Sequence, residues 1–207
     1  KRVPSNYEET RSTNPIDLMA SGLFASHFIN TVSPTFLEEI VMGRHDFVPS
    51  QIRHEMKQKL EAGCACGILN APDPSYDPAV DEKLIMRYNV DTHYEGKMAN
   101  KLAFQEKMGL AKDMNAPLFF WPSRLDPVQK GCQLLTEILY KVISKYSKDN
   151  LQIAVVANGP YQKHFRDIQR MHGFHNRLAI SDFDEELSHL GYEAADFTLM
   201  PSLFEPC

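Results

Sequence analysis

The sequence predicts an α/β protein whose larger part is a doubly wound parallel sheet. In the longer, C-terminal part of the chain, short apolar runs alternate with amphipathic stretches of helical period. This alternation is typical of parallel strands covered by helices on both faces. Ahead of it, three prolines between Ala71 and Pro78 stiffen and extend the backbone. We therefore expect residues 70–78 to link a first domain, at 1–69, to a second domain, at 79–207.

The first domain alternates helix and strand signals. Ser33 is a good helix N-cap, and Pro34 suits the first helical position, so we expect a helix to begin there. The expected elements are a loop over about residues 1–15, a helix over 16–28, a strand over 28–33, the helix from Ser33, a helix over 50–62 and a short strand over 67–70.

The second domain is expected to begin with a helix and to continue as strand and helix pairs. The helices are expected over 97–108, 128–146, 161–172 and 184–192, and the strands over 117–121, 151–157, 177–180 and 197–200. The longest helix carries a single apolar face made of Leu134, Leu135, Ile138, Leu139, Val142, Ile143 and Tyr146. In an open sheet of this kind, ligands bind beyond the carboxyl ends of the strands.

Composition limits the classes of partner. A formal net charge of −5 argues against nucleic acid, which favours a basic surface. No apolar run approaches the ~20 residues that span a bilayer, so we expect no membrane partner. The four cysteines are scattered, and Cys64-Ala65-Cys66 lacks the spacing of a zinc site. We therefore expect reduced thiols, no metal and a cytoplasmic location.

The turn after the first strand of the second domain brings two cations to the ligand edge. It reads Ser123-Arg124-Leu125-Asp126-Pro127-Val128-Gln129-Lys130-Gly131 and leads into a helix. Arginine and lysine beside the free N–H groups of a helix N-terminus are typical of a phosphate site. The alternative is that Arg124 and Lys130 are solvated surface charges.

Three further strand ends reach the same edge. Gly159 follows one strand and permits close approach of a ligand, or serves only the tight turn. Phe183 follows the next strand and either stacks on a base or belongs to the core. Glu205 follows the last strand, and the chain stops two residues later, which predicts a piece of a larger enzyme. Motifs of serine hydrolases, dinucleotide-binding proteins and P-loop proteins are missing.

Several of these stretches together resemble bacterial glycogen synthase and plant starch synthase. The resemblance rests on Thr31-Val32-Ser33-Pro34-Thr35, Gly67-Ile68-Leu69-Asn70, Lys97-x-x-Asn100-Lys101, Ser123-Arg124-Leu125-x-x-x-Gln129-Lys130-Gly131 and Ala194-Ala195-Asp196-Phe197-x-x-Met200-Pro201-Ser202-x-Phe204-Glu205-Pro206-Cys207. These stretches run in the family's order from about residue 16 to the end of the chain.

The resemblance implies a GT-B glycosyltransferase that transfers glucose from ADP-glucose to the non-reducing end of an α-1,4-glucan, with retention and without a metal or other cofactor. It implies the end of an N-terminal, acceptor-side domain at 1–69 and the first part of a Rossmann-like C-terminal domain at 79–207. The expected partners are a nucleotide sugar and an α-glucan. In a plant, the expected location is the plastid. A fragment of this extent is expected to be inactive alone.

The resemblance also implies roles for individual residues. Arg124 and Lys130 would bind the diphosphate and stabilise the charge on the leaving ADP, and Glu205 would hold the donor glucose. The catalytic set is therefore Arg124, Lys130 and Glu205; the nucleotide-binding set is Ser123, Arg124, Lys130, Gly159 and Phe183; and the sugar-binding set is Asn70, Glu205 and Cys207.

Departures from the family leave two other functions open. Ala71-Pro72-Asp73 stands where the family has Gly-Ile/Val-Asp, and the spacing from Arg124 to Lys130 is one residue longer than usual. Ala157 replaces the first glycine of a Gly-x-Gly turn. One alternative is a non-catalytic glucan-binding or assembly protein with a degenerate GT-B fold. The other is a GT-B enzyme that uses a different nucleotide sugar.

Overall fold

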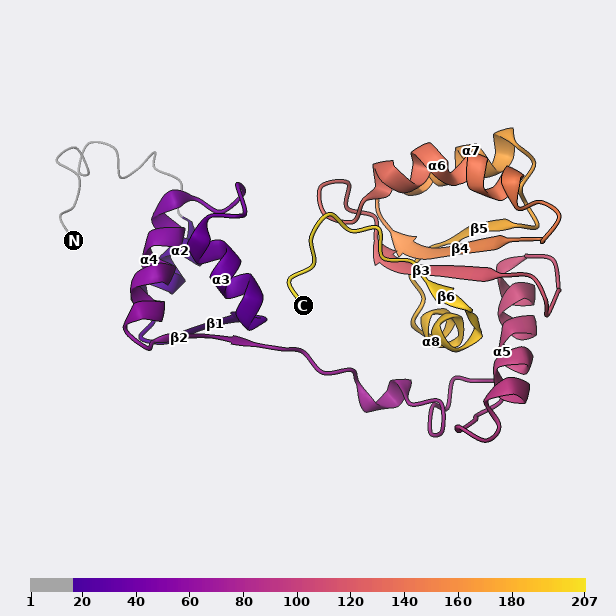
Figure 1. The fold of residues 1–207 in the computed structure, drawn as a ribbon, viewed down its shortest axis with the longest axis horizontal. Helices are drawn as coiled ribbons and strands as arrows, with labels where there is room; N and C mark the ends of the chain where they lie inside the picture. The colour runs from indigo at the N-terminus through magenta and orange to yellow at the C-terminus, as the bar shows by residue number, and fades with distance from the viewer. Residues whose placement is uncertain (1–16) are drawn as a thin grey trace. The chain divides into compact units, whose positions relative to one another are not determined.

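The computed structural model describes residues 17–207, which form two compact units (Figure 1). One unit extends to Ala71 and also takes in Pro206 and Cys207, and the other comprises Pro72–Glu205. The division falls inside the predicted linker at 70–78, and most of that segment groups with the second unit. The loop expected at 1–15 lies outside the described residues. The predicted assignment of the units to acceptor and donor domains stays a prediction.

From residue 17 onward, the first unit contains a pair of parallel strands and three helices. They are α2 (Leu18–Ala25), β1 (Ile29–Val32), α3 (Pro34–Met42), α4 (Ser50–Glu61) and β2 (Ala65–Ile68). The predicted start of α3 is confirmed, because the Ser33 hydroxyl accepts a hydrogen bond from the Phe36 N–H at 3.4 Å. The strand expected at 67–70 instead spans Ala65–Ile68, because it pairs with β1 from Ile29 opposite Ala65 to Val32 opposite Ile68. Asn70 lies beyond the strand and is exposed.

The second unit is a four-stranded sheet with every described pairing parallel, in the order β5-β4-β3-β6. Its strands are β3 (Leu118–Arg124), β4 (Gln152–Asn158), β5 (Leu178–Ser181) and β6 (Phe197–Thr198). Its helices are the short 3₁₀ turn η1 (Pro74–Tyr76), α5 (His93–Met108), α6 (Cys132–Lys145), α7 (Gln162–Met171) and α8 (Glu185–Ala194).

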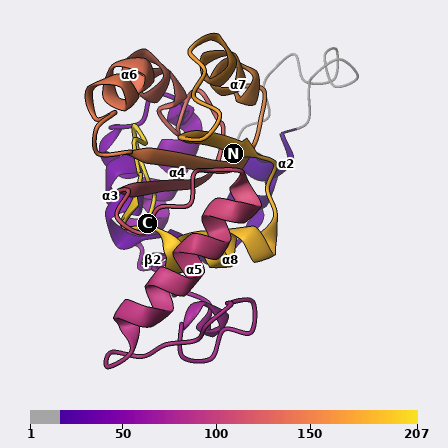
Figure 2. The same ribbon diagram turned by 90° about the vertical axis from the view of Figure 1, so that its right-hand side faces the viewer.

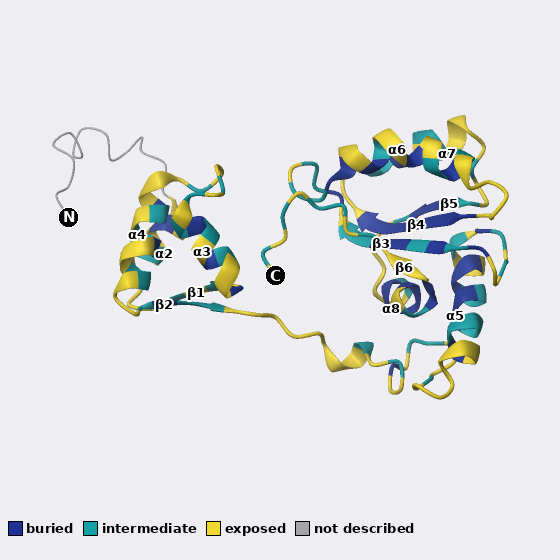
Figure 3. Ribbon diagram, in the orientation of Figure 1, coloured by how far each residue is buried: buried dark blue, intermediate teal, exposed yellow. Residues whose placement is uncertain are grey.

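Helices cover both faces of this sheet, so the doubly wound prediction is confirmed. Helices α6 and α7 lie on one face, and α5 and α8 lie on the other (Figures 1 and 2). Trp121, Leu139 and Phe165 pack in the core under α6 and α7. Phe104 and Phe120 pack edge to face in the core over α5 and α8. The central strand β4 is buried from Gln152 to Ala157, whereas both residues of β6, at the edge of the sheet, are exposed (Figure 3).

Helix α6 begins four residues later than predicted. The Asp126 carboxylate accepts hydrogen bonds from the N–H groups of Val128 at 2.8 Å and Gln129 at 3.3 Å, which forms a turn in place of helix. The predicted apolar face is only partly buried, because the sheet covers one side of it and leaves Leu134 and Ile138 49% exposed. The helix therefore carries apolar surface that the periodicity alone assigned to the core.

Helix α5 begins at His93, earlier than predicted, and buries the polar side chains of Asn100, Lys101 and Gln105. The Asn100 side chain accepts from the N–H groups of Ile85 at 3.0 Å and Met86 at 3.2 Å, and donates to the Met86 carbonyl at 2.8 Å. These bonds hold the preceding loop against the helix.

Lys101 ties α5 to the sheet. Its ammonium lies 2.7 Å from the Asp196 carboxylate and 3.1 Å from the Met114 carbonyl oxygen. The same carboxylate oxygen of Asp196 accepts from the Leu118 N–H at 2.8 Å, where β3 begins. The stretch Lys97-x-x-Asn100-Lys101 therefore has a structural role in this unit. No helix within residues 17–207 has the length and apolarity needed to cross a membrane.

Candidate functional site

A pocket of about 290 Å³ opens at the carboxyl ends of the strands of the second unit. It is lined by Tyr76, Pro122, Ser123, Arg124, Lys130, Phe183, Ser188 and Tyr192. Four of these residues, Ser123, Arg124, Lys130 and Phe183, were predicted from the sequence to bind a nucleotide. The structure brings them together around one cavity, with two cations and three aromatic side chains in its wall. This volume lies at the lower end of the range for small-molecule sites.

The turn after β3 carries both cations. Arg124 is the last residue of β3 and pairs in register with Asn158 of β4, and the Leu125 N–H donates to the Asn158 carbonyl at 2.8 Å. The Lys130 N–H closes the turn on the Asp126 carbonyl at 2.9 Å. These hydrogen bonds fix the shape of the turn, and Arg124 at its start and Lys130 at its end both line the pocket.

The N-terminus of α6 adds a second attraction for anions. Its N-cap, Gly131, has no side chain to accept a hydrogen bond from the first turn. The first N–H groups of a helix have no partner within the helix, and the helix dipole makes that end positive. This helix end and the two cations together form an arrangement suited to a diphosphate.

Gly131 also brings the C-terminal segment to the turn. Its φ is +66°, and a Cβ there would lie 1.9 Å from the Pro201 carbonyl oxygen, so only glycine allows this approach. Beside it, the Leu203 N–H donates to the Gln129 carbonyl at 2.8 Å. These contacts hold the segment that follows β6 against the turn that follows β3.

This close backbone contact brings the Glu205 carboxylate to the Lys130 ammonium. The Lys130 Nζ lies 2.6 Å from the Glu205 Oε1, and the side chains are 16% and 32% exposed. Burial alone would raise the pKa of the Glu205 carboxyl. The hydrogen bond from Lys130 and the charges of Lys130 and Arg124 outweigh that effect, so the pKa lies below its ordinary value of 4.5. A bound phosphate must therefore compete with this carboxylate for Lys130.

Gly159 and Phe183 are placed by the turn after β4. Gly159 has a φ of +144°, and a Cβ there would lie 2.9 Å from both the Cβ and the carbonyl oxygen of Leu125. Gly159 therefore lets two neighbouring strand-end turns pack together. The Asn158 side chain accepts from the Phe183 N–H at 2.9 Å and so fixes the loop that carries Phe183. The Phe183 ring is 59% exposed, so it does not belong to the core, and its contact with a base stays a prediction.

Asn70 and Cys207 group with the first unit, and both are exposed. Their predicted contacts with sugar stay predictions. Sequence reasoning missed four residues that line the pocket: Tyr76, Pro122, Ser188 and Tyr192. Tyr76 was placed in the predicted linker, and its only sequence signal was an aromatic residue among prolines. Tyr192 lies on α8, where helical periodicity does not distinguish a pocket wall from core.

All four cysteines are free thiols. Cys132 is buried at the start of α6, and burial raises the pKa of its thiol to about 11. Cys64 and Cys66 are half-buried free thiols of the first unit. Over residues 17–207, no group of three or more His, Cys, Asp or Glu side chains is arranged to hold a metal ion.

Neutralising Glu205 should strengthen nucleotide binding. At pH 7, we expect the Glu205→Gln variant of the complete gene product to bind ADP about fivefold more tightly, because Lys130 no longer has to leave a carboxylate whose pairing contributes up to about 1 kcal/mol. Isothermal titration calorimetry measures the affinity. Glu137→Gln, on the exposed surface of α6, is the matched control and should leave the affinity unchanged.

The lowered pKa of Glu205 fixes the direction in which stability and ADP affinity change with pH. Folding lowers the pKa of Glu205, so the ion pair stabilises the folded chain above the ordinary pKa of 4.5 and loses this contribution as the pH falls through the lowered pKa. The affinity difference between the wild type and Glu205→Gln should disappear over the same range. Equal ADP affinities at pH 7 would show that the pair does not compete with the phosphate.

Known proteins resemble the chain in sequence over nearly its whole length. It is 31% identical over 205 residues to granule-bound starch synthase 1 of Solanum tuberosum, covering 97% of this chain and 32% of that protein. It is 30% identical to the glycogen synthase of Mycoplasma mobile and 31% identical to that of Bacillus cytotoxicus, covering 42% and 40% of those proteins. No protein-family model matches the chain.

A solved structure resembles the chain in fold. The catalytic domain of starch synthase IV from Arabidopsis thaliana, bound to ADP and acarbose, matches 91% of this chain with a TM-score of 0.75 and 28% identity. The chain covers 37% of that structure, so it spans between about a third and two-fifths of the proteins it matches. The predicted resemblance is confirmed: the chain is homologous to part of the glycogen and starch synthases and has the parallel α/β fold of a GT-B catalytic domain.

Proposed function

We propose that the chain supplies the nucleotide-sugar site of a retaining glucosyltransferase that moves glucose from ADP-glucose to the non-reducing end of an α-1,4-glucan. The observation that carries the proposal is the convergence of Ser123, Arg124, Lys130 and Phe183 on one pocket, with Glu205 paired to Lys130. Homology to glycogen and starch synthases supports the donor and acceptor classes.

Each part of the pocket suits one part of the donor. Arg124, Lys130 and the N-terminus of α6 would bind the diphosphate and stabilise the negative charge that develops on ADP as it leaves. Phe183 would pack on the base. Glu205 would exchange its bond to Lys130 for the donor glucose when the diphosphate takes over the ammonium. Asn70 and Cys207 are proposed to contact sugar.

The two cations also support a reaction that does not depend on a metal ion. They provide positive charge where a divalent ion would otherwise neutralise the diphosphate. We therefore propose that no metal or other cofactor is needed. We also propose a cytoplasmic location, or a plastid if the source is a plant.

Glucosyl transfer by the complete gene product tests the proposal. With ADP-glucose and glycogen, we expect ADP release coupled to new α-1,4 linkages, measured by a coupled enzyme assay and by proton NMR of the glucan. Treatment with EDTA should leave the rate within about twofold of the untreated rate. A UDP-glucose rate above the ADP-glucose rate would favour the different-donor alternative. Glycogen binding without release of either nucleotide would favour the non-catalytic alternative.

A further inference from the structure

We propose that Tyr76 is a nucleoside-contacting residue of the pocket, held in place by a buried histidine network. This inference rests on the proposed function, because it takes the ligand to be a nucleotide sugar. Tyr76 belongs to η1, within the proline-rich segment that the sequence marks as a linker. The structure folds this segment onto the second unit, and the Tyr76 side chain lines the same cavity as Arg124, Lys130 and Phe183.

Aromatic side chains hold Tyr76 in one orientation. Its ring stacks on the His189 ring, with centroids 3.7 Å apart and an interplanar angle of 15°. Its edge meets the Tyr192 ring at 5.6 Å and 85°. Asp73 caps the η1 turn by accepting a hydrogen bond from the Ser75 N–H at 2.9 Å. A ring restrained in this way loses little conformational entropy when a ligand binds.

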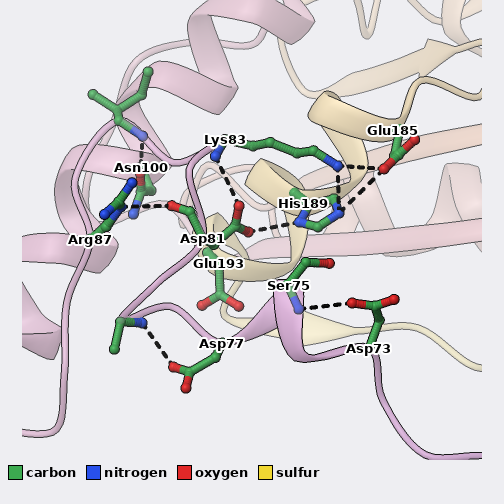
Figure 4. Close-up of polar contacts among 12 residues, drawn as sticks. Asp73, Ser75, Asp77, Asp81, Lys83, Arg87, Asn100, Glu185, His189 and Glu193 are labelled. Carbon is green, nitrogen blue, oxygen red and sulfur yellow. Dashed lines mark hydrogen bonds and ion pairs between the residues drawn. The ribbon is translucent and has the colours of Figure 1, made fainter.

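The histidine beneath Tyr76 is itself fixed on both sides (Figure 4). His189 is 1% exposed, and its Nδ1 lies 2.7 Å from the Asp81 Oδ2, also buried. Its Nε2 lies 3.1 Å from the Lys83 Nζ, which pairs with Glu185 at 2.5 Å. An imidazole protonated at Nδ1 satisfies both contacts, because it donates to Asp81 and accepts from Lys83. His189 is therefore a rigid platform under Tyr76.

The distribution of side chains around the pocket indicates which part of the ligand Tyr76 meets. The cations Arg124 and Lys130 suit the diphosphate, and Glu205 binds Lys130 on that side. Phe183, Tyr76 and Tyr192 make up the aromatic part of the wall. Burial raises the pKa of the Tyr76 phenol, so the ring stays neutral near physiological pH. A neutral aromatic ring suits a base or ribose rather than a phosphate.

Binding of two ligands that share the diphosphate tests the proposal. ADP carries the nucleoside, and inorganic pyrophosphate does not. In the complete gene product, we expect Tyr76→Leu to weaken ADP binding about tenfold, the scale of a lost base–aromatic contact, and to leave pyrophosphate binding unchanged. Tyr76→Phe should keep ADP binding within about twofold of the wild type. Isothermal titration calorimetry measures both ligands, and thermal melting checks that each variant folds.

Two control variants separate the possible outcomes. Tyr140→Leu removes an exposed tyrosine that, like Tyr76, packs on a histidine, His172 at 4.2 Å, and should change neither affinity. Arg124→Ala should weaken the binding of both ADP and pyrophosphate. Two results with Tyr76→Leu would overturn the role of Tyr76: unchanged ADP binding, or ADP and pyrophosphate binding weakened equally. If Arg124→Ala weakens ADP binding in the same experiment, the nucleotide site itself stands. If the folded wild type binds neither ligand, the proposed function fails as well.

Discussion

Replacing Lys130 by alanine should slow glucosyl transfer from ADP-glucose by on the order of 10²-fold, because the ammonium stabilises charge that appears on the diphosphate only as ADP leaves. Lys130 is held at the pocket by the turn after β3, and its side chain is only 16% exposed. A charge in such a partly dehydrated position contributes more than one on the open surface. Steady-state kcat and KM for ADP-glucose in the complete gene product measure the effect.

Whether the Lys130→Ala variant changes kcat or KM tells which interaction has been lost. Loss of transition-state stabilisation lowers kcat, whereas loss of ground-state binding alone raises KM. Lys141→Ala removes an exposed lysine of α6 and is the matched control, which should change neither constant. A Lys130→Ala variant with a kcat like that of the wild type would contradict the catalytic role.

Replacing Lys101 by methionine should lower the free energy of unfolding by about 3 kcal/mol, because it leaves the Asp196 carboxylate partly buried without its cation. The Lys101 side chain is 3% exposed and Asp196 is 30% exposed, and their charged atoms are 2.7 Å apart. Methionine lacks the terminal Nζ but keeps an unbranched apolar stem, so packing of the rest of the side chain changes little. Urea unfolding of the chain, followed by the fluorescence of Trp121, its single tryptophan, measures the loss.

A surface pair provides the comparison for Lys101. Lys112 and Glu106 also lie 2.7 Å apart, but their side chains are 51% and 67% exposed. Lys112→Met should therefore cost less than about 1 kcal/mol, as is usual for exposed pairs. Equal losses for Lys101→Met and Lys112→Met would show that burial does not give the Lys101 pair its importance.

Much of the second unit follows from local sequence. Apolar runs such as the one ending at Ala157 are too short for helices and too continuous for exposed strands, so they indicate buried parallel strands. The helix boundaries were less predictable. Asp126 forms a side-chain turn that delays α6, and the pairing of β6 with β3 extends over only two residues. Such local hydrogen bonds override the helical or strand periodicity, and the spacing of apolar residues in the sequence hardly reveals them.

The candidate site divides in the same way. Because parallel strands end at one edge of a sheet, the sequence alone was enough to predict that Ser123, Arg124, Lys130 and Phe183 share that edge. Which residues touch was decided by tertiary packing. Lys130 meets Glu205 because Gly131 accepts the backbone of Pro201.

By itself, the sequence determined the fold class, the ligand edge and the family resemblance, because each depends on residue types at short, regular spacing. Only the tertiary structure decided the ion pair at Lys130, the burial of Asn100 and Lys101, and the placement of Tyr76 on His189. These contacts join residues far apart in the chain, and their geometry depends on how the helices and loops pack on the sheet, which no local pattern encodes.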